Sequence, residues 1–452
     1  MILIENKNYL FTNKDLLKLI FPLMVEQLLI MTVGLAGSIM VASVGESAVS
    51  AVSLVDSVIL LLINIFAALA TGGAVVSGQF IGQKKYSDAC KSGEQLIVFS
   101  TSISIIIMII MYLCRGFILN VVFGDIEQEV YNYANTYLLI TFASIPFIAL
   151  YNSGAALFRT MGNSKITMVI SLIMNLINII GNALFVYVFH QGVLGVAISA
   201  LVSRIISSLI IIHLLRNEGL IIHLSKPFSY KFDGIMVKKI LHIGVPNGIE
   251  NSMFQLGKIL LLSIVAQFGT ASITANAVSN TVANFQILPG FAIGLGLVTV
   301  ISQCVGAGDY EQVRYYTKKL IKYAYISMFC INVVIMLVLP FILNIYNLSE
   351  ETAAMVKQVL IFHSVNSIIS WPLAFTLPNT LRASNDVRYT MIVGVFSMWI
   401  FRIGFGIWIA KYLNYGMFGT WIAMIIDWII RSTLFTIRYR GHKWEIKNNE
   451  TT

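Results

Sequence analysis

The feature that most restricts how this chain can fold is a series of long segments without Asp, Glu, Lys or Arg. Such segments lie at residues 57–83, 95–114, 130–158, 323–349 and 358–381. A helix needs about 20 apolar residues to cross a bilayer, so each segment is long enough. Two longer charge-free segments, 166–203 and 259–308, must each contain a turn, for which Gly192 and Gly269 are the signals.

Composition agrees with a protein that is largely surrounded by hydrocarbon. Hydrophobic residues make up 57% of the chain and charged residues only 11%, against roughly 25% charged in a soluble domain. We therefore predict an all-α integral membrane protein with twelve transmembrane helices. Their expected spans are 16–43, 48–81, 93–119, 130–157, 166–189, 194–216, 239–266, 272–305, 318–345, 353–379, 388–411 and 417–439.

The distribution of Lys and Arg orients these helices. Alternate loops are basic, and by the positive-inside rule these loops and both termini are expected in the cytoplasm. The basic loop residues are Lys84, Lys85, Lys91, Arg159, Lys165, Arg216, Lys226, Lys231, Lys238, Lys239, Arg314, Lys318, Lys319, Arg382 and Arg388. The net charge of +9 thus reflects topology rather than a nucleic-acid partner. The polar, mixed-charge start of the chain predicts no cleaved signal peptide, and we expect a multi-pass protein of the bacterial inner membrane.

The second half of the sequence repeats the first at one fixed displacement. Pro22 aligns with Pro246 and Glu26 with Glu250, and in the same register Gly45, Gly72, Gln79 and Tyr86 also meet identical residues. The repeat divides the chain into a first six-helix lobe at 1–220, a cytoplasmic linker at 221–237 and a second lobe at 238–452. Both lobes would start in the cytoplasm, which makes them parallel repeats with a substrate cavity expected between them.

The repeated residues also carry a resemblance to a known family. FPLMVEQLL and VPNGIENSM place a proline early in the first helix of each lobe, the second helix ends in SGQFIGQKK, the fourth in FRTMGNS, and the eleventh contains FRIGFGI. In these motifs, in order along the whole chain, the sequence resembles the MATE (multidrug and toxic compound extrusion) family. The resemblance implies two six-helix bundles arranged in a V, and an antiporter that exports organic cations or amphiphiles against entering H⁺ or Na⁺.

Three departures from the family pattern concern its carboxylates. Gly37 and Ser38 stand where the first helix often carries an aspartate and its neighbour, and Asn182 stands where the fifth helix often carries another carboxylate. A glutamate that some branches carry in the seventh helix falls near Phe254. The family's best-known carboxylate positions therefore do not transfer to this chain.

Glu26 and Glu250 are the leading candidates for cation coupling. An ionisable side chain in a membrane helix costs a few kcal/mol, so each suggests a function. Both follow a proline by one helical turn, where a missing backbone hydrogen bond loosens the helix. Each could carry H⁺ or bind Na⁺ with a neighbouring amide, or could instead anchor two helices. Asn178 and Asn182, which share one helix face with Asn175, are added to the predicted coupling site.

Other polar and aromatic residues in the predicted helices are candidates for substrate binding. Lys258 could pair with Asp56 or extend to the outer surface, and the amides of the eighth helix recur on one face. The predicted substrate-binding set is Gln27, Asp56, Gln255, Lys258, Asn276, Asn280, Asn284 and Phe254. Asp427 and Arg431, four residues apart, are expected to neutralise each other, while Arg402 and Arg204 need acceptors within their bundles.

Enzyme and metal-site motifs are missing from the sequence. It contains no P-loop, GxSxG or HExxH pattern, and its four cysteines lack metal-ligand spacing. We expect a transporter rather than an enzyme, driven by an ion gradient, with no cofactor beyond Na⁺ or H⁺. Its expected partners are membrane lipid and a small cationic or amphiphilic substrate, and it is expected to be a monomer. A lipid-linked oligosaccharide or other lipid flippase of the same superfamily stays open as an alternative.

Overall fold

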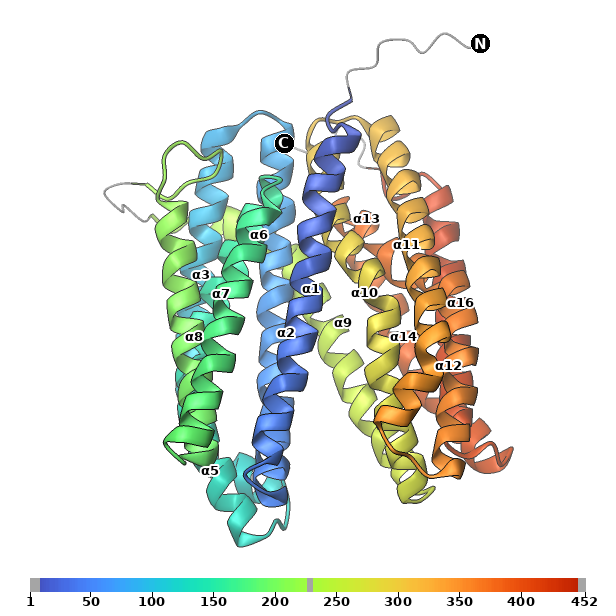
Figure 1. The fold of residues 1–452 in the computed structure, drawn as a ribbon. Helices are drawn as coiled ribbons and strands as arrows, with labels where there is room; N and C mark the ends of the chain where they lie inside the picture. The colour runs from blue at the N-terminus through green and yellow to red at the C-terminus, as the bar shows by residue number, and fades with distance from the viewer. Residues whose placement is uncertain (1–8, 226–230, 446–452) are drawn as a thin grey trace. The chain divides into compact units, whose positions relative to one another are not determined.

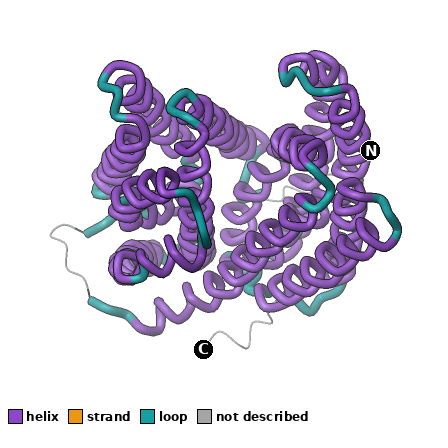
Figure 2. Tube along the Cα trace, turned by 90° about the horizontal axis from the view of Figure 1, so that it is seen from below, coloured by secondary structure: helices purple, strands orange, loops and turns teal. Residues whose placement is uncertain are grey.

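The computed structural model describes residues 9–225 and 231–445, and within these ranges every regular element is a helix (Figures 1 and 2). Lys226 and the neighbouring linker residues 227–230 lie outside the described residues. The expectation of an all-α protein is confirmed.

Among the described residues, eleven single helices are long and apolar enough to cross a membrane, and one bent helix pair brings the number to twelve. The bent pair is α5 (Gln128–Ala143) followed by α6 (Ile145–Thr160), with an angle of 46° between them. Pro146 explains the break, because it has no backbone N–H to continue the hydrogen bonds of the preceding helix. The remaining helices of the first half are α1 (Asn13–Ala42), α2 (Glu46–Gly82), α3 (Tyr86–Leu113), α4 (Arg115–Phe117), α7 (Ser164–Ala183) and α8 (Gly192–Leu215).

Both halves also contain short π-helical segments that extend their α-helices. Two lie in the first half, at Ile118–Val122 and Leu184–Val188, and three in the second, at Pro372–Thr376, Met398–Gly404 and Trp408–Tyr412. The α-helices of the second half are α9 (Gly234–Ala266), α10 (Thr270–Gly306), α11 (Tyr310–Ile345), α12 (Glu350–Trp371), α13 (Pro378–Ala383), α14 (Val387–Ser397), α15 (Phe405–Ile407) and α16 (Gly416–Arg440).

Some helices begin earlier than the apolar segments predict. The expected span 318–345 is part of α11, which starts at Tyr310. The side chain of Asp309 accepts a hydrogen bond from the Gln312 backbone N–H and caps this extra polar turn. Apolar length marks only the part of a helix that lies in hydrocarbon, so the polar turns beyond it were missed.

The backbone repeats as the sequence does. Positive φ angles occur at Gly45 and Gly269, where α2 and α10 begin, and again at Gly192 and Gly416, where α8 and α16 begin. Each pair is related by the same displacement that aligns Pro22 with Pro246. Because glycine adopts positive φ without a steric penalty, the same chain reversals are available at the same points of both halves.

The chain separates into two compact units. Leu17–Gly248 forms one, called here the N-lobe, and Ile249–Thr452 together with Met1–Leu16 forms the other, called the C-lobe. The N-lobe core lies between α2, α5 and α6 around Phe66, Leu138 and Phe142. The C-lobe core surrounds Trp371, Trp421 and Trp428. Each lobe therefore has an apolar interior of its own, in which a buried polar group is an exception that needs a partner.

Candidate functional site

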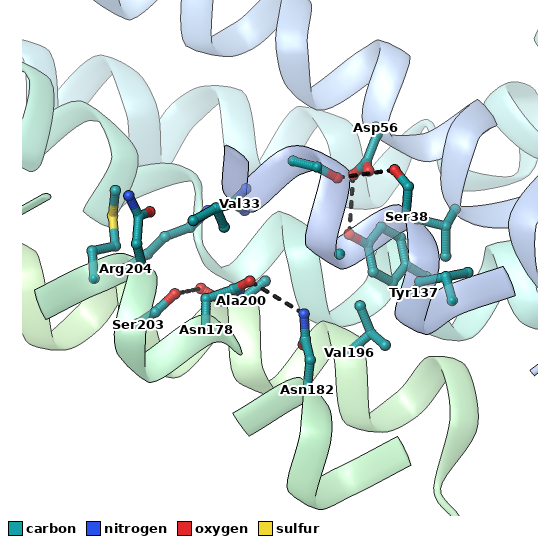
Figure 3. A pocket seen from close by; sticks show the side chains of 16 residues that line it. Val33, Ser38, Asp56, Tyr137, Asn178, Asn182, Val196, Ala200, Ser203 and Arg204 are labelled. Atoms are coloured by element: carbon teal, nitrogen blue, oxygen red, sulfur yellow. Dashed lines mark hydrogen bonds between the residues drawn. The ribbon is translucent and has the colours of Figure 1, made fainter. Parts of the chain in front are cut away.

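A pocket of about 250 Å³ lies inside the N-lobe. Five helices contribute to it, namely α1, α2, α5, α7 and α8, and Figure 3 shows its side chains. The residues that surround it are Val33, Gly34, Gly37, Ser38, Val41, Val52, Asp56, Tyr137, Met174, Asn175, Asn178, Asn182, Val196, Ala200, Ser203 and Arg204. Polar groups thus gather in an open pocket between helices that are otherwise apolar, and Asp56 and Ser38 are exposed in it.

Small residues on α1 leave space for this pocket, and amide residues on α7 make it polar. Gly34 and Gly37 bring no side chain from α1 into it; a Cβ on Gly37 would lie 4.0 Å from the Asn182 side-chain nitrogen. On α7, Asn175, Asn178 and Asn182 are spaced by three and four residues, which puts them on one helix face. The two helices together form an amide-rich wall opposite a small-residue wall.

Asp56 is the acidic residue of the pocket. The Tyr137 hydroxyl donates a hydrogen bond to its carboxylate at 3.0 Å, and Figure 3 shows the two side chains pointing toward each other. Arg204 lines the same pocket and donates from Nη1 to the Ser144 hydroxyl at 2.7 Å. One carboxylate, one phenol and one guanidinium from three different helices therefore meet in this cavity.

The amides of α7 leave hydrogen-bonding capacity unused. Asn182 is 2% exposed, and its side-chain N–H donates to Asn178 Oδ1 at 3.2 Å. Within the described residues, Asn182 Oδ1 and Asn175 Nδ2 have no hydrogen-bond partner. A buried polar atom without a partner costs about 1–3 kcal/mol, so a group bound in the pocket would recover part of that cost.

Glu26 lies outside this pocket and is paired with a basic residue of its own lobe. Arg159 Nη1 lies 3.1 Å from Glu26 Oε1, and the Thr167 hydroxyl donates to Glu26 Oε2 at 2.7 Å. Glu26 is 2% exposed. In the C-lobe, Arg382 Nη2 donates to Glu250 Oε2 at 2.8 Å. Both glutamates are thus half of a buried ion pair.

Comparison with known proteins agrees with the repeat and the resemblance. The MatE family model matches residues 22–184 and again residues 246–408, two segments related by the displacement of the internal repeat. The chain belongs to the MATE family. It is therefore a multi-pass membrane transport protein and not an enzyme.

The similarity to curated relatives and to solved structures extends over nearly the whole chain. An uncharacterized transporter of Bacillus subtilis, YisQ, is 24% identical over 95% of this chain and 94% of its own length. A probable multidrug resistance protein, NorM of Thermotoga maritima, is 24% identical over 96% and 93%. An outward-facing multidrug resistance MATE family transporter superposes with a TM-score of 0.89 at 19% identity, covering 94% of this chain and 95% of that one. At this identity the superposition shows the fold.

The ionisable residues of the C-lobe form a connected cluster in this transporter. Arg431 Nε donates to Asp427 Oδ1 at 2.8 Å, which confirms the expected neutralisation. Arg431 Nη1 also lies 4.0 Å from Glu250 Oε1, and Arg402 Nη1 lies 3.9 Å from Asp427 Oδ2. Glu250 and Asp427 are therefore shared among several guanidinium groups.

The Phe254 ring lies close to three basic side chains of the C-lobe. Lys258 Nζ, Arg402 Cζ and Arg431 Cζ lie 5.0, 5.1 and 5.6 Å from the centre of its ring. The ring face is electron-rich and attracts cations. The position where a glutamate was expected by family resemblance thus carries an aromatic ring surrounded by positive charge.

The remaining predicted substrate-binding residues are dispersed. Asn276 accepts a hydrogen bond from the Trp421 indole N–H at 3.1 Å, and the Asn280 side chain donates to the Asn276 backbone at 2.8 Å. Asn284 is exposed on α10. Gln27 and Gln255 are half-buried on α1 and α9, and neither lines the N-lobe pocket.

The pocket therefore unites three predicted residues and adds others that the sequence did not single out. Asp56, Asn178 and Asn182 come together, although Asp56 was assigned to substrate and the two amides to the coupling ion. Tyr137 was missed because it lies among several tyrosines and asparagines in QEVYNYANTY, where nothing distinguishes it. The spacing of Asn175 from Asn178 did place Asn175 on the correct face.

Proposed function

We propose that this MATE protein is a secondary active exporter of organic cations and amphiphiles. It would work as a single chain by alternating access, with H⁺ or Na⁺ entering as substrate leaves. The names of its relatives support export of drugs, since NorM of Thermotoga maritima is a probable multidrug resistance protein. The basic loops support cytoplasmic termini in a bacterial inner membrane.

The observation that carries the coupling part of this proposal is the N-lobe pocket. Its volume of about 250 Å³ is below the roughly 300–1,000 Å³ of pockets for drug-sized ligands. The pocket is thus small for a drug-sized ligand, and its polar lining suits a small hydrated ion. We assign it to the coupling ion, and we assign the organic substrate to other surfaces.

Asp56 is the group we propose to carry the coupling charge. Of the described residues that line the pocket it is the one with a carboxylate, and its Tyr137 partner is neutral rather than a basic residue at ion-pair distance. Glu26 and Glu250 were predicted for this role, but each already has an arginine as counter-charge. A carboxylate held only by a phenol can take up a proton, or can bind Na⁺ together with amide oxygens of Asn178 and Asn182.

The proposal is tested by transport into liposomes that contain the purified protein. A cationic dye such as ethidium is supplied while a pH gradient or a Na⁺ gradient is imposed, each in turn. We expect dye movement against the ion flux under one of the two gradients. No gradient-driven movement under either condition would refute the antiporter.

Asp56→Asn tests the assignment of the coupling group. We expect it to abolish the response to the ion gradient while dye binding persists, because the amide can neither hold a proton nor supply negative charge. The matched control is Glu46→Gln, which removes an exposed carboxylate at the start of the same helix. Wild-type coupling in Asp56→Asn would remove Asp56 from the mechanism.

A further inference from the structure

The basic residues that contact the Phe254 ring or pair with Glu250 and Asp427 outnumber the acidic residues available to them. Lys258, Arg382, Arg402 and Arg431 share only Glu250 and Asp427 among the groups joined by ion pairs and ring contacts in the described C-lobe. The cluster therefore carries two more positive than negative charges when all six groups are ionised. Repulsion between like charges is strong in surroundings of low dielectric constant.

The two carboxylates are engaged mainly by Arg382 and Arg431. Arg382 lies 2.8 Å from Glu250, and Arg431 lies 2.8 Å from Asp427. Arg402 reaches Asp427 only at 3.9 Å. Lys258 makes no ion pair with any residue that the structure describes and faces the Phe254 ring at 5.0 Å. The surplus charge thus resides on Arg402 and Lys258.

Arg402 also has an unused hydrogen-bond donor. Its side chain is 9% exposed, and its Nε has no partner among the described residues. A buried guanidinium normally satisfies its donors with carboxylate, phosphate or carbonyl oxygens. Asp427 Oδ2 also lacks a hydrogen-bond partner among the described residues, but it lies 3.9 Å from Arg402 Nη1, too far for a hydrogen bond. The Arg402 Nε–H is therefore left for a further acceptor.

Lys258 and Phe254 are the residues of the cluster that a ligand can reach. Lys258 is exposed on α9 and Phe254 is half-buried one helical turn before it. The Phe254 ring also packs edge-on against Phe375 at 6.1 Å. An apolar, aromatic surface therefore lies next to the surplus positive charge. This combination is complementary to a ligand with a flat apolar body and an acidic group.

We propose that Lys258 and Arg402 form an anion-binding subsite of the C-lobe. It binds a carboxylate or phosphate group of an amphiphile whose apolar body packs on Phe254. This assignment rests on the proposed export of amphiphiles and narrows their class to compounds that carry an acidic group. The oxyanion accepts hydrogen bonds from Arg402 and neutralises the surplus charge, while Phe254 supplies the apolar contact.

Binding to the full-length protein in nanodiscs of neutral phosphatidylcholine tests the subsite without requiring transport. Pyrenebutyrate is compared with pyrenebutanol, which has the same aromatic body without the acid. We expect the wild-type protein to bind the acid about tenfold more tightly, the size of one charge-assisted interaction. Lys258→Gln should remove this preference and leave the affinity for pyrenebutanol unchanged.

Two variants complete the test. Lys357→Gln removes an exposed lysine from α12 and should keep the preference, whereas Lys258→Arg should restore it. A second set of nanodiscs containing phosphatidic acid identifies the source of the oxyanion. Competition with pyrenebutyrate that depends on Lys258 would assign the subsite to a lipid headgroup, and lack of competition would assign it to a soluble amphiphile.

Equal binding of pyrenebutyrate and pyrenebutanol by the wild-type protein would overturn the subsite. A preference that survives in Lys258→Gln would overturn it as well. If the antiport proposal is wrong, gradient-driven dye movement will be absent while the binding preference for pyrenebutyrate remains. The two measurements therefore separate the subsite from the transport cycle.

Discussion

Arg382 donates to the Glu250 carboxylate at 2.8 Å in the C-lobe, and this ion pair has a counterpart between Arg159 and Glu26 in the N-lobe. The two glutamates align in the internal repeat, and the two arginines fall within one position of alignment. In each lobe the glutamate belongs to the first membrane helix and the arginine to the end of the fourth. Since the same long-range pair forms twice in one chain, it is part of the architecture that the repeat preserves.

Glu250→Gln should destabilise the C-lobe by about 3 kcal/mol, the lower end of the cost of breaking a buried ion pair. The substitution leaves Arg382 without its counter-charge and removes the more distant partner of Arg431. Thermal unfolding in detergent measures the change, with Glu46→Gln as the control. The double variant Glu250→Gln with Arg382→Gln should lose less than the two single losses combined. Unchanged unfolding would contradict a structural role for the pair.

Asn182→Leu should weaken coupling-ion binding about tenfold with little loss of stability. The substitution removes an amide oxygen that lacks a protein partner, so the fold gives up only the bond to Asn178. The dependence of dye transport on ion concentration measures the effect. Asn64→Leu on α2 is the control, because that side chain bonds only to its own helix. An unaltered ion dependence would exclude Asn182 as a ligand.

Gly72→Ala should destabilise the N-lobe by about 2 kcal/mol through overpacking. A Cβ at this position would lie 2.5 Å from the Ile240 carbonyl oxygen and 2.9 Å from the Gly244 nitrogen. Both are backbone atoms of α9 and cannot rotate away. Gly34→Ala on α1 has no heavy atom within 4 Å of its new Cβ, so it should unfold at or above the wild-type temperature. Equal behaviour of the two variants would contradict the close approach of α2 and α9.

Tyr316→Phe should release the chain that precedes α1. The Tyr316 hydroxyl accepts from the Phe11 N–H at 2.8 Å and donates to the Phe11 carbonyl at 2.7 Å. Hydrogen exchange of the Phe11 amide should become about tenfold faster, which corresponds to about 1.4 kcal/mol. Tyr315→Phe keeps both bonds and serves as the control. Equal exchange in both variants would show that these hydrogen bonds do not hold the segment.

Local sequence information was sufficient for features that lie within one helix. The twelve membrane spans follow from apolar length, and their centres were predicted correctly. The Asp427–Arg431 pair was also predicted, because a separation of four residues brings two side chains together on any α-helix. The conformation of the loop glycines at 45 and 269 follows the repeat that the sequence already shows.

Partners from different helices could not be assigned in this way. Helical periodicity places Asn178 and Asn182 on one face of α7, but does not say that Asp56 of α2 and Tyr137 of α5 meet that face. Glu26 was predicted as a coupling carboxylate or an anchor between two helices, and its partner Arg159, 133 residues away, follows only from the tertiary structure. Phe254 was predicted as a substrate-binding residue, but the sequence does not show that Arg402 and Arg431, from two other segments, lie near its ring beside Lys258 of its own helix.

The sequence by itself determined that this chain crosses the membrane as helices, that its two halves share one register and that it is a MATE transporter. Those properties depend on apolar length and on residues compared at a fixed displacement. Only the tertiary structure decided which polar groups neutralise one another and which are left over. In a medium without water each charge must find its partner by packing, and packing joins residues that are far apart in the chain.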